Sequence, residues 1–141
     1  IERLESPEPV RITARVGRRI PLYAGSAGKC MLAFMPAAKC EEILNQIVLT
    51  PLTQATICEK DALRKDLEKI RQEGCAVSYG EWILEASGVA APIFNEFGML
   101  IAALTVSGPG QRFTEEKVKE LKEIVKEKAQ EISMKLGYAP H

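Results

Sequence analysis

Two apolar segments separated by a four-residue turn constrain the fold of this chain more than any other feature. Val89–Phe94 and Met99–Ser107 flank Asn95-Glu96-Phe97-Gly98, a sequence typical of a hairpin turn. The second segment is almost continuously apolar as far as Thr105. That pattern predicts a central strand that is covered on both faces. Pro92 cannot donate to a ladder, so we expect a bulge or an unpaired edge there.

Helices and shorter strands are expected on both sides of this hairpin. The predicted strands are Val10–Val16, Cys75–Tyr79 and Glu81–Glu85, and the predicted helices are Ser26–Met35, Pro36–Ile47, Glu59–Glu73 and one from the cap Thr114 to Gly137. An order of strands, helices, antiparallel strands and a final helix indicates an α+β fold.

A turn of very small residues, Gly25-Ser26-Ala27-Gly28, joins an apolar strand end to an apolar helix. The first amides of a helix have no intrahelical partner and lie at the positive end of its dipole, so such a turn can bind a carboxylate or phosphate. Alternatively, the small residues allow the helix to pack closely. A nucleotide-binding P-loop is excluded, because Tyr23 and Cys30 stand where that motif needs Gly and Ser or Thr.

Composition limits the kind of protein and its partners. The chain has 141 residues, which suits one domain, and its 19 basic residues balance its 19 acidic residues. A nucleic-acid-binding surface usually shows a basic excess, so we expect no direct contact with DNA. The four cysteines form no C-x-x-C pair, and no signal peptide or membrane-length apolar run is present. These features predict reduced thiols, a cytoplasmic location and no membrane partner.

Catalytic side chains are scarce. The only histidine is the last residue, His141, so Ser–His–Asp and Cys–His arrangements are not available inside the domain. A zinc site would require four distant thiols to converge. Glu81 and Glu85 either perform acid–base chemistry or, as part of a polar strand face, are solvated. We therefore predict no enzyme activity, no metal and no cofactor.

A polar patch in an apolar setting is the remaining candidate site. Thr105 and Ser107 are two residues apart on a predicted strand and therefore share a face. A buried hydroxyl without a partner costs about 1–3 kcal/mol, so each bonds either neighbouring backbone or a ligand. Together with the open amides of the small-residue turn, they suit a small organic acid. Trp82 is either a wall of that pocket or a contact between subunits.

The order of these motifs resembles the effector-binding domain of IclR-type bacterial transcription regulators, from about Val10 to Tyr138. The matching segments are Gly17-x-x-Ile20-Pro21-Leu22-x-Ala24-x-x-Ala27-Gly28-Lys29-x-x-Leu32-Ala33, Thr53-x-x-Thr56-Ile57, Leu63 to Gly74, Gly88-Val89-Ala90-Ala91-Pro92-Ile93-Phe94, Gly98-x-x-Ile101-Ala102-Ala103-Leu104-Thr105-Val106-Ser107-Gly108-Pro109 and Ile132-Ser133-x-x-Leu136-Gly137.

The resemblance implies a GAF-like fold, in which helices cover both faces of a curved antiparallel sheet and the concave face holds a ligand. It divides the chain into a truncated first strand and turn (1–9), the effector-binding domain (10–138) and a tail (139–141). It also implies a winged helix-turn-helix domain that this chain lacks, through which alone the protein would bind DNA. The expected assembly is a homodimer or homotetramer.

The resemblance also assigns ligand contacts to positions of this chain. They are Ile12 as an apolar wall, the turn at Ser26, Ala27 and Gly28, the polar side chain of Ser78, Gly88, and the hydroxyls of Thr105 and Ser107. Members that bind short keto acids tend to have an acidic residue in place of Ser78 and a thiol in place of Gly88. Both differences predict a larger cavity and a different ligand.

Three functions are thus open. The chain is expected to be the ligand-sensing and oligomerisation domain of a transcription regulator, in which a small carboxylate controls transcription. The alternatives are a stand-alone GAF-like binding module and a small enzyme with a Cys or Ser nucleophile.

Overall fold

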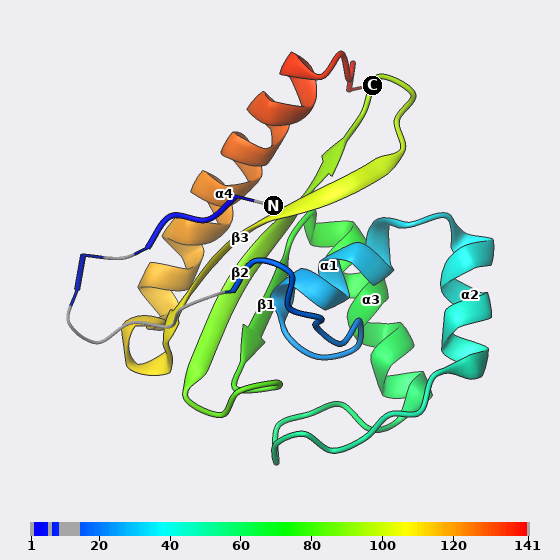
Figure 1. Cartoon of the computed structure of the whole chain (residues 1–141), viewed down its shortest axis with the longest axis vertical. Helices are drawn as coiled ribbons and strands as arrows, with labels where there is room; N and C mark the ends of the chain where they lie inside the picture. Colours follow the sequence, from blue (N-terminus) through cyan, green and yellow to red (C-terminus); the bar gives the residue numbers. More distant parts are fainter. Residues whose placement is uncertain (1, 6, 9–14, 141) are drawn as a thin grey trace.

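The computed structural model describes residues 2–5, 7–8 and 15–140. Its elements are α1 (Ser26–Phe34), α2 (Ala37–Gln46), α3 (Lys60–Glu73), β1 (Ala76–Tyr79), β2 (Ala86–Phe94), β3 (Leu100–Pro109), the short 3-10 helix η1 (Gly110–Arg112) and α4 (Glu115–Lys135). The strands form an antiparallel sheet in the order β1-β2-β3. Helix α4 lies against one face, and α1 and α3 lie against the other (Figure 1). The expected α+β fold with helices on both faces is confirmed.

Strand β2 separates two hydrophobic cores, because successive side chains of a strand point to opposite faces. Val89, Ala91 and Ile93 pack with α4. Ala90 and its cross-strand neighbour Ala76 pack instead with residues from α1, α2 and α3. The even-numbered positions of β2 therefore face α1, and the odd-numbered positions face α4.

The expectation that Met99–Ser107 is covered on both faces is wrong. Among the described strands β2 is central, and β3 pairs with β2 at the edge of the described sheet. The side chains of Ile101 and Val106 are exposed. The physical reason lies in side-chain size: β2 begins Ala-Ser-Gly-Val-Ala-Ala, and such small residues let helices approach both faces closely.

At Pro92, strand β2 pairs with only one of the two described strands beside it. It lies opposite Ala103 of β3, whereas β1 begins at Ala76, opposite Ala90, and offers Pro92 no partner. The register of β2 with β3 shifts one residue later, between Ile93 and Phe94. The expected unpaired edge at Pro92 is confirmed.

The expected strand over Glu81–Glu85 does not form. These residues make a bent connection that is closed by hydrogen bonds from Gly80 N to Ala86 O (2.8 Å) and from Ala86 N to Ile83 O (2.9 Å). Gly80 has a φ of +66°, and a Cβ there would lie 2.6 Å from Leu84 O. Such a tight turn requires glycine, and it directs Glu81 into the protein.

The ends of the helices agree with the local signals in the sequence. Thr114 caps α4 by accepting a hydrogen bond from Lys117 N at 3.2 Å. Gly74 ends α3 with a φ of 80°, and Pro36 precedes α2. Most of the predicted strand at 10–16, including Ile12, lies outside the described residues.

Candidate functional site

The amino end of α1 presents backbone donors that have no described partner. Gly25 occupies the N-cap with a φ of 87°, and no side chain caps the helix. The first helical hydrogen bond runs from Lys29 N to Gly25 O at 3.2 Å, and the amides of Ser26, Ala27 and Gly28 donate to no described residue. Three open amides at the positive end of a helix favour an anionic acceptor.

Close packing accounts for Gly28 itself. A Cβ at this position would lie 2.1 Å from Pro21 O and 3.1 Å from Leu22 Cα. The helix therefore crosses the backbone of the preceding segment with no room for a side chain. Both interpretations of the small-residue turn apply, since Gly28 allows this contact while the neighbouring amides stay open.

The structure brings four of the predicted site residues together. Ser26 lies at this helix end, and three others lie on the sheet opposite it. Ser78, Gly88 and Ser107 form one row across the three strands, because Gly88 is the register partner of the other two. A Cβ on Gly88 would lie 2.6 Å from Ser26 Oγ and 3.3 Å from Ser107 Oγ. Ser26 and Ser78 are buried, and Ser107 is exposed. The row is thus polar and open at its β3 end.

Thr105 extends the polar surface into the interior. It lies opposite Ala90, one of the β2 residues that face α1, so Thr105 shares the face of Ser107. Its Oγ1 is buried and makes no hydrogen bond to any described residue. A backbone partner, one of the two alternatives for this hydroxyl, is not found in the described chain.

A buried ion-pair network that the sequence analysis missed supports the same turn. Lys29 Nζ lies 2.6 Å from Asp66 Oδ2, 2.8 Å from Glu81 Oε2 and 3.3 Å from Val77 O. Lys29 is 1% exposed and Glu81 is 9% exposed. The expectation that Glu81 is solvated is wrong, whereas Glu85 is exposed.

One signal in the sequence points to this network. Lys29 stands in a helix that is otherwise small or apolar, Ser-Ala-Gly-Lys-Cys-Met-Leu-Ala-Phe. A lysine there is buried, and a buried lysine needs an anionic partner. The ammonium group of Lys29 is already paired with two carboxylates. A ligand at the amino end of α1 would therefore meet amides and hydroxyls rather than a free ammonium group.

Trp82 lies beside the turn at the amino end of α1. A Cβ added at Gly25 would lie 3.8 Å from the Cβ of Trp82. The Arg18 guanidinium lies 4.6 Å from the centre of the Trp82 ring. Trp82 is half-buried and packs against the α1 core. This position favours the first of the two alternatives for Trp82, a wall next to the site.

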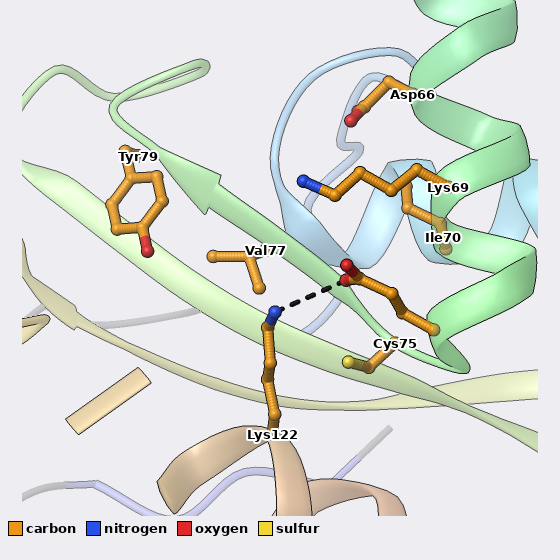
Figure 2. A pocket seen from close by; sticks show the side chains of 8 residues that line it. Asp66, Lys69, Ile70, Cys75, Val77, Tyr79 and Lys122 are labelled. Atoms are coloured by element: carbon orange, nitrogen blue, oxygen red, sulfur yellow. Dashed lines mark hydrogen bonds and ion pairs between the residues drawn. The ribbon is translucent and has the colours of Figure 1, made fainter. Parts of the chain in front are cut away.

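A separate pocket of about 120 Å³ lies between α3, β1 and α4 (Figure 2). It is lined by Asp66, Lys69, Ile70, Glu73, Cys75, Val77, Tyr79 and Lys122. Lys122 extends from α4 toward α3, where its Nζ pairs with Glu73 Oε2 at 3.3 Å (Figure 2). None of the predicted site residues lines this pocket, and its Lys122 is already paired with Glu73.

Three of the cysteines are poor nucleophiles. Burial raises the pKa of Cys30 to about 12, and it also raises the pKa of Cys40 and of Cys75. Because the thiolate is the reactive form, these thiols are inert near neutral pH. All four cysteines are free, and Cys58 is exposed.

Iodoacetamide at about pH 8 should therefore modify Cys58 and spare the other three cysteines of the folded chain. Mass spectrometry of peptides from folded and urea-unfolded protein measures this directly. Rapid modification of Cys30 in the folded protein would contradict the prediction and revive a Cys nucleophile.

The described residues contain neither a metal-binding cluster nor a membrane-spanning helix. No group of three or more His, Cys, Asp or Glu side chains among residues 2–5, 7–8 and 15–140 is placed to hold a metal ion. Across the same residues, no helix combines the length and the apolar character needed to cross a membrane.

Comparison with known proteins establishes the family. The family described as "Bacterial transcriptional regulator IclR C-terminal" matches residues 1–134. The chain belongs to the IclR family. The HTH-type transcriptional regulator KipR of Bacillus subtilis is 35% identical over 138 residues, which cover 98% of this chain and 55% of KipR. The chain thus spans about half the length of this transcriptional regulator.

Solved structures confirm that this is the fold of an IclR C-terminal domain. Thermotoga maritima IclR matches with a TM-score of 0.91 and 39% identity over 96% of this chain and 55% of that one. A double mutant of the inducer-binding domain of PobR from Acinetobacter, in complex with 3-hydroxybenzoic acid, matches with a TM-score of 0.77 and 26% identity over 84% of this chain and 69% of that one.

Proposed function

We propose that this IclR-family effector-binding domain binds a small organic acid and thereby controls transcription through a DNA-binding domain of the full-length protein. The observation that carries the proposal is the buried Thr105 hydroxyl, which has no described partner and shares a sheet face with the row opposite the open amides of α1. A ligand acceptor would relieve a cost of about 1–3 kcal/mol at this hydroxyl.

The chemistry of the site favours a carboxylate. The amides of Ser26 and Ala27 would donate to one carboxylate, which gains roughly 0.3–1 kcal/mol from the helix dipole and up to about 2 kcal/mol when partly buried. Thr105, Ser107 and Ser78 would donate to the same group or to polar atoms nearby. The acid bound by the related PobR domain supports this ligand class.

Regulation requires that the ligand distinguish two arrangements of the full-length protein, because equal affinity for both transmits nothing. We propose that these are arrangements of a cytoplasmic homodimer or homotetramer. The exposed apolar side chains Ile101 and Val106 of β3 and Ile124 and Ile132 of α4 support self-association. DNA is contacted outside this domain, whose 19 basic and 19 acidic residues balance.

Two substitutions, which differ in their expected effects on stability, test the site. Thr105→Val removes a buried hydroxyl at nearly constant shape, so the ligand-free protein should gain about 1 kcal/mol of unfolding free energy. Ser107→Ala removes an exposed hydroxyl, and stability should change by less than about 0.5 kcal/mol. Both should weaken a bound acid about five- to tenfold. Urea unfolding and thermal shifts with a panel of organic acids, 3-hydroxybenzoate included, measure these effects.

Thr105→Ser is the matched control, because it keeps the hydroxyl and should keep most of the affinity. If the affinity for an acid is unchanged in both Thr105→Val and Ser107→Ala, that acid binds elsewhere and the assigned site is wrong. If no acid in the panel raises the melting temperature, the proposed ligand class is wrong.

A further inference from the structure

An uncompensated negative charge lies at the proposed ligand site. Two carboxylates, Asp66 and Glu81, share the single ammonium group of Lys29, so the network as a whole carries one negative charge. In a partly buried setting such a charge acts over several ångströms, because the surrounding dielectric is far lower than that of water.

Glu81 places this charge at the amino end of α1. Its Oε2 accepts from Lys29 Nζ at 2.8 Å, and its Oε1 accepts from Gly25 N at 3.4 Å. Its backbone carbonyl also accepts a hydrogen bond from Thr56 Oγ1 at 2.7 Å. Glu81 is therefore held from both ends, next to the amides assigned above to the ligand.

Asp66 differs from Glu81 in its surroundings. It comes from α3, and its side chain is 28% exposed, against 11% for that of Glu81. No hydrogen bond joins Asp66 to Gly25 among the described residues. Water therefore screens the charge of Asp66 more effectively than that of Glu81.

We propose that Glu81 determines the charge of the ligand: the site accepts acids with one negative charge and rejects dianions. This inference rests on the proposed function. A first carboxylate gains the open amides and the helix dipole. A second carboxylate meets Glu81, while Lys29 is already paired and Arg18 lies exposed over Trp82.

Pairs of acids that differ by a single charge test the proposal. Succinamate and 3-carbamoylbenzoate are monoanions with nearly the shapes of the dianions succinate and isophthalate. The wild-type chain should bind the monoanion of a pair about tenfold more tightly, as measured by isothermal titration calorimetry near neutral pH. In Glu81→Gln, which makes the network neutral, the two members should bind within about twofold of each other.

Two variants separate charge from structure. Glu81→Asp keeps the charge, so it should keep the preference for the monoanion even where both affinities fall. Asp66→Asn removes the same formal charge from a more exposed position and should reduce the preference by less than about threefold. Circular dichroism and melting curves establish that each variant is folded.

The possible outcomes are distinct. Equal weakening of both acids in Glu81→Gln would show that Glu81 is merely structural and would overturn the inference. Should Glu81→Gln fail to fold, a wild-type chain that binds succinate as tightly as succinamate would overturn it as well. If monoanions bind but these comparisons fail, the proposed function survives. If neither member of either pair binds the wild-type chain or any variant, the proposal of an acid ligand is wrong, and the inference about Glu81 is wrong with it.

Discussion

Replacing Lys29 with methionine is expected to lower the free energy of unfolding by about 3–5 kcal/mol. Methionine fits the space of the lysine stem, but it leaves two carboxylates, Asp66 and Glu81, without their shared ammonium group. An unpaired carboxylate in a buried position loses its solvation and gains nothing in return. Urea unfolding followed by circular dichroism measures the change.

Lys39→Met is the matched control. Lys39 pairs with Glu42 at 3.7 Å on the surface of α2, and its side chain is 59% exposed. Exposed pairs contribute little, so the change should be less than about 0.5 kcal/mol. Adding Asp66→Asn and Glu81→Gln to Lys29→Met should recover part of the loss. No recovery would mean that packing of the lysine stem, rather than charge, accounts for the effect.

Gly28→Ala is expected to destabilise the protein by about 3 kcal/mol, the upper end of the range for overpacking. A methyl group would lie 2.1 Å from Pro21 O, which is a backbone atom, so no flexible side chain can turn aside to make room. The preceding segment or α1 must therefore move. The same shift would displace the open amides of Ser26 and Ala27, so acid binding should fall together with stability.

The expected loss of stability in Gly28→Ala is opposite in sign to the effect of helix propensity. Helix propensity alone predicts that Gly→Ala inside a helix stabilises by about 1 kcal/mol. The reverse change at the neighbouring position, Ala27→Gly, should cost only about 1 kcal/mol, because it loses propensity without a clash. Thermal and urea unfolding of both variants compare the two. A Gly28→Ala variant as stable as the wild type would show that α1 does not pack against Pro21 as described.

Features that depend on neighbouring residues were predictable from the sequence. The helix ends at Pro36, Gly74 and Thr114 follow from capping chemistry and from the restricted backbone of proline and glycine. The alternation of β2 between two faces likewise follows from strand geometry.

Features that depend on distant residues were harder to predict. The apolar run of β3 predicts burial on both faces, but among the described strands it is β2, with its small side chains, that has helices against both faces. The local sequence around Glu81 predicts a polar strand, but Glu81 is buried because it pairs with Lys29, 52 positions away. A local pattern holds no information about such a pairing.

The candidate site lies between these two cases. The shared face of Thr105 and Ser107 follows from their spacing. The alignment of Ser107 with Gly88 and Ser78 depends on the strand register, which the structure supplies. The family resemblance assigned these positions to one site without predicting that register.

The division of β2 between two faces bears on how domains of this kind diversify. Gly88 and Ala90 face the helix and the hydroxyls assigned to the ligand, whereas Val89 and Ala91 fasten the sheet to α4. Substitutions at adjacent positions of β2 should therefore act on different properties of the domain. An exchange at Gly88 or Ala90 would alter the proposed ligand site, whereas one at Val89 or Ala91 would alter the packing of the sheet against α4.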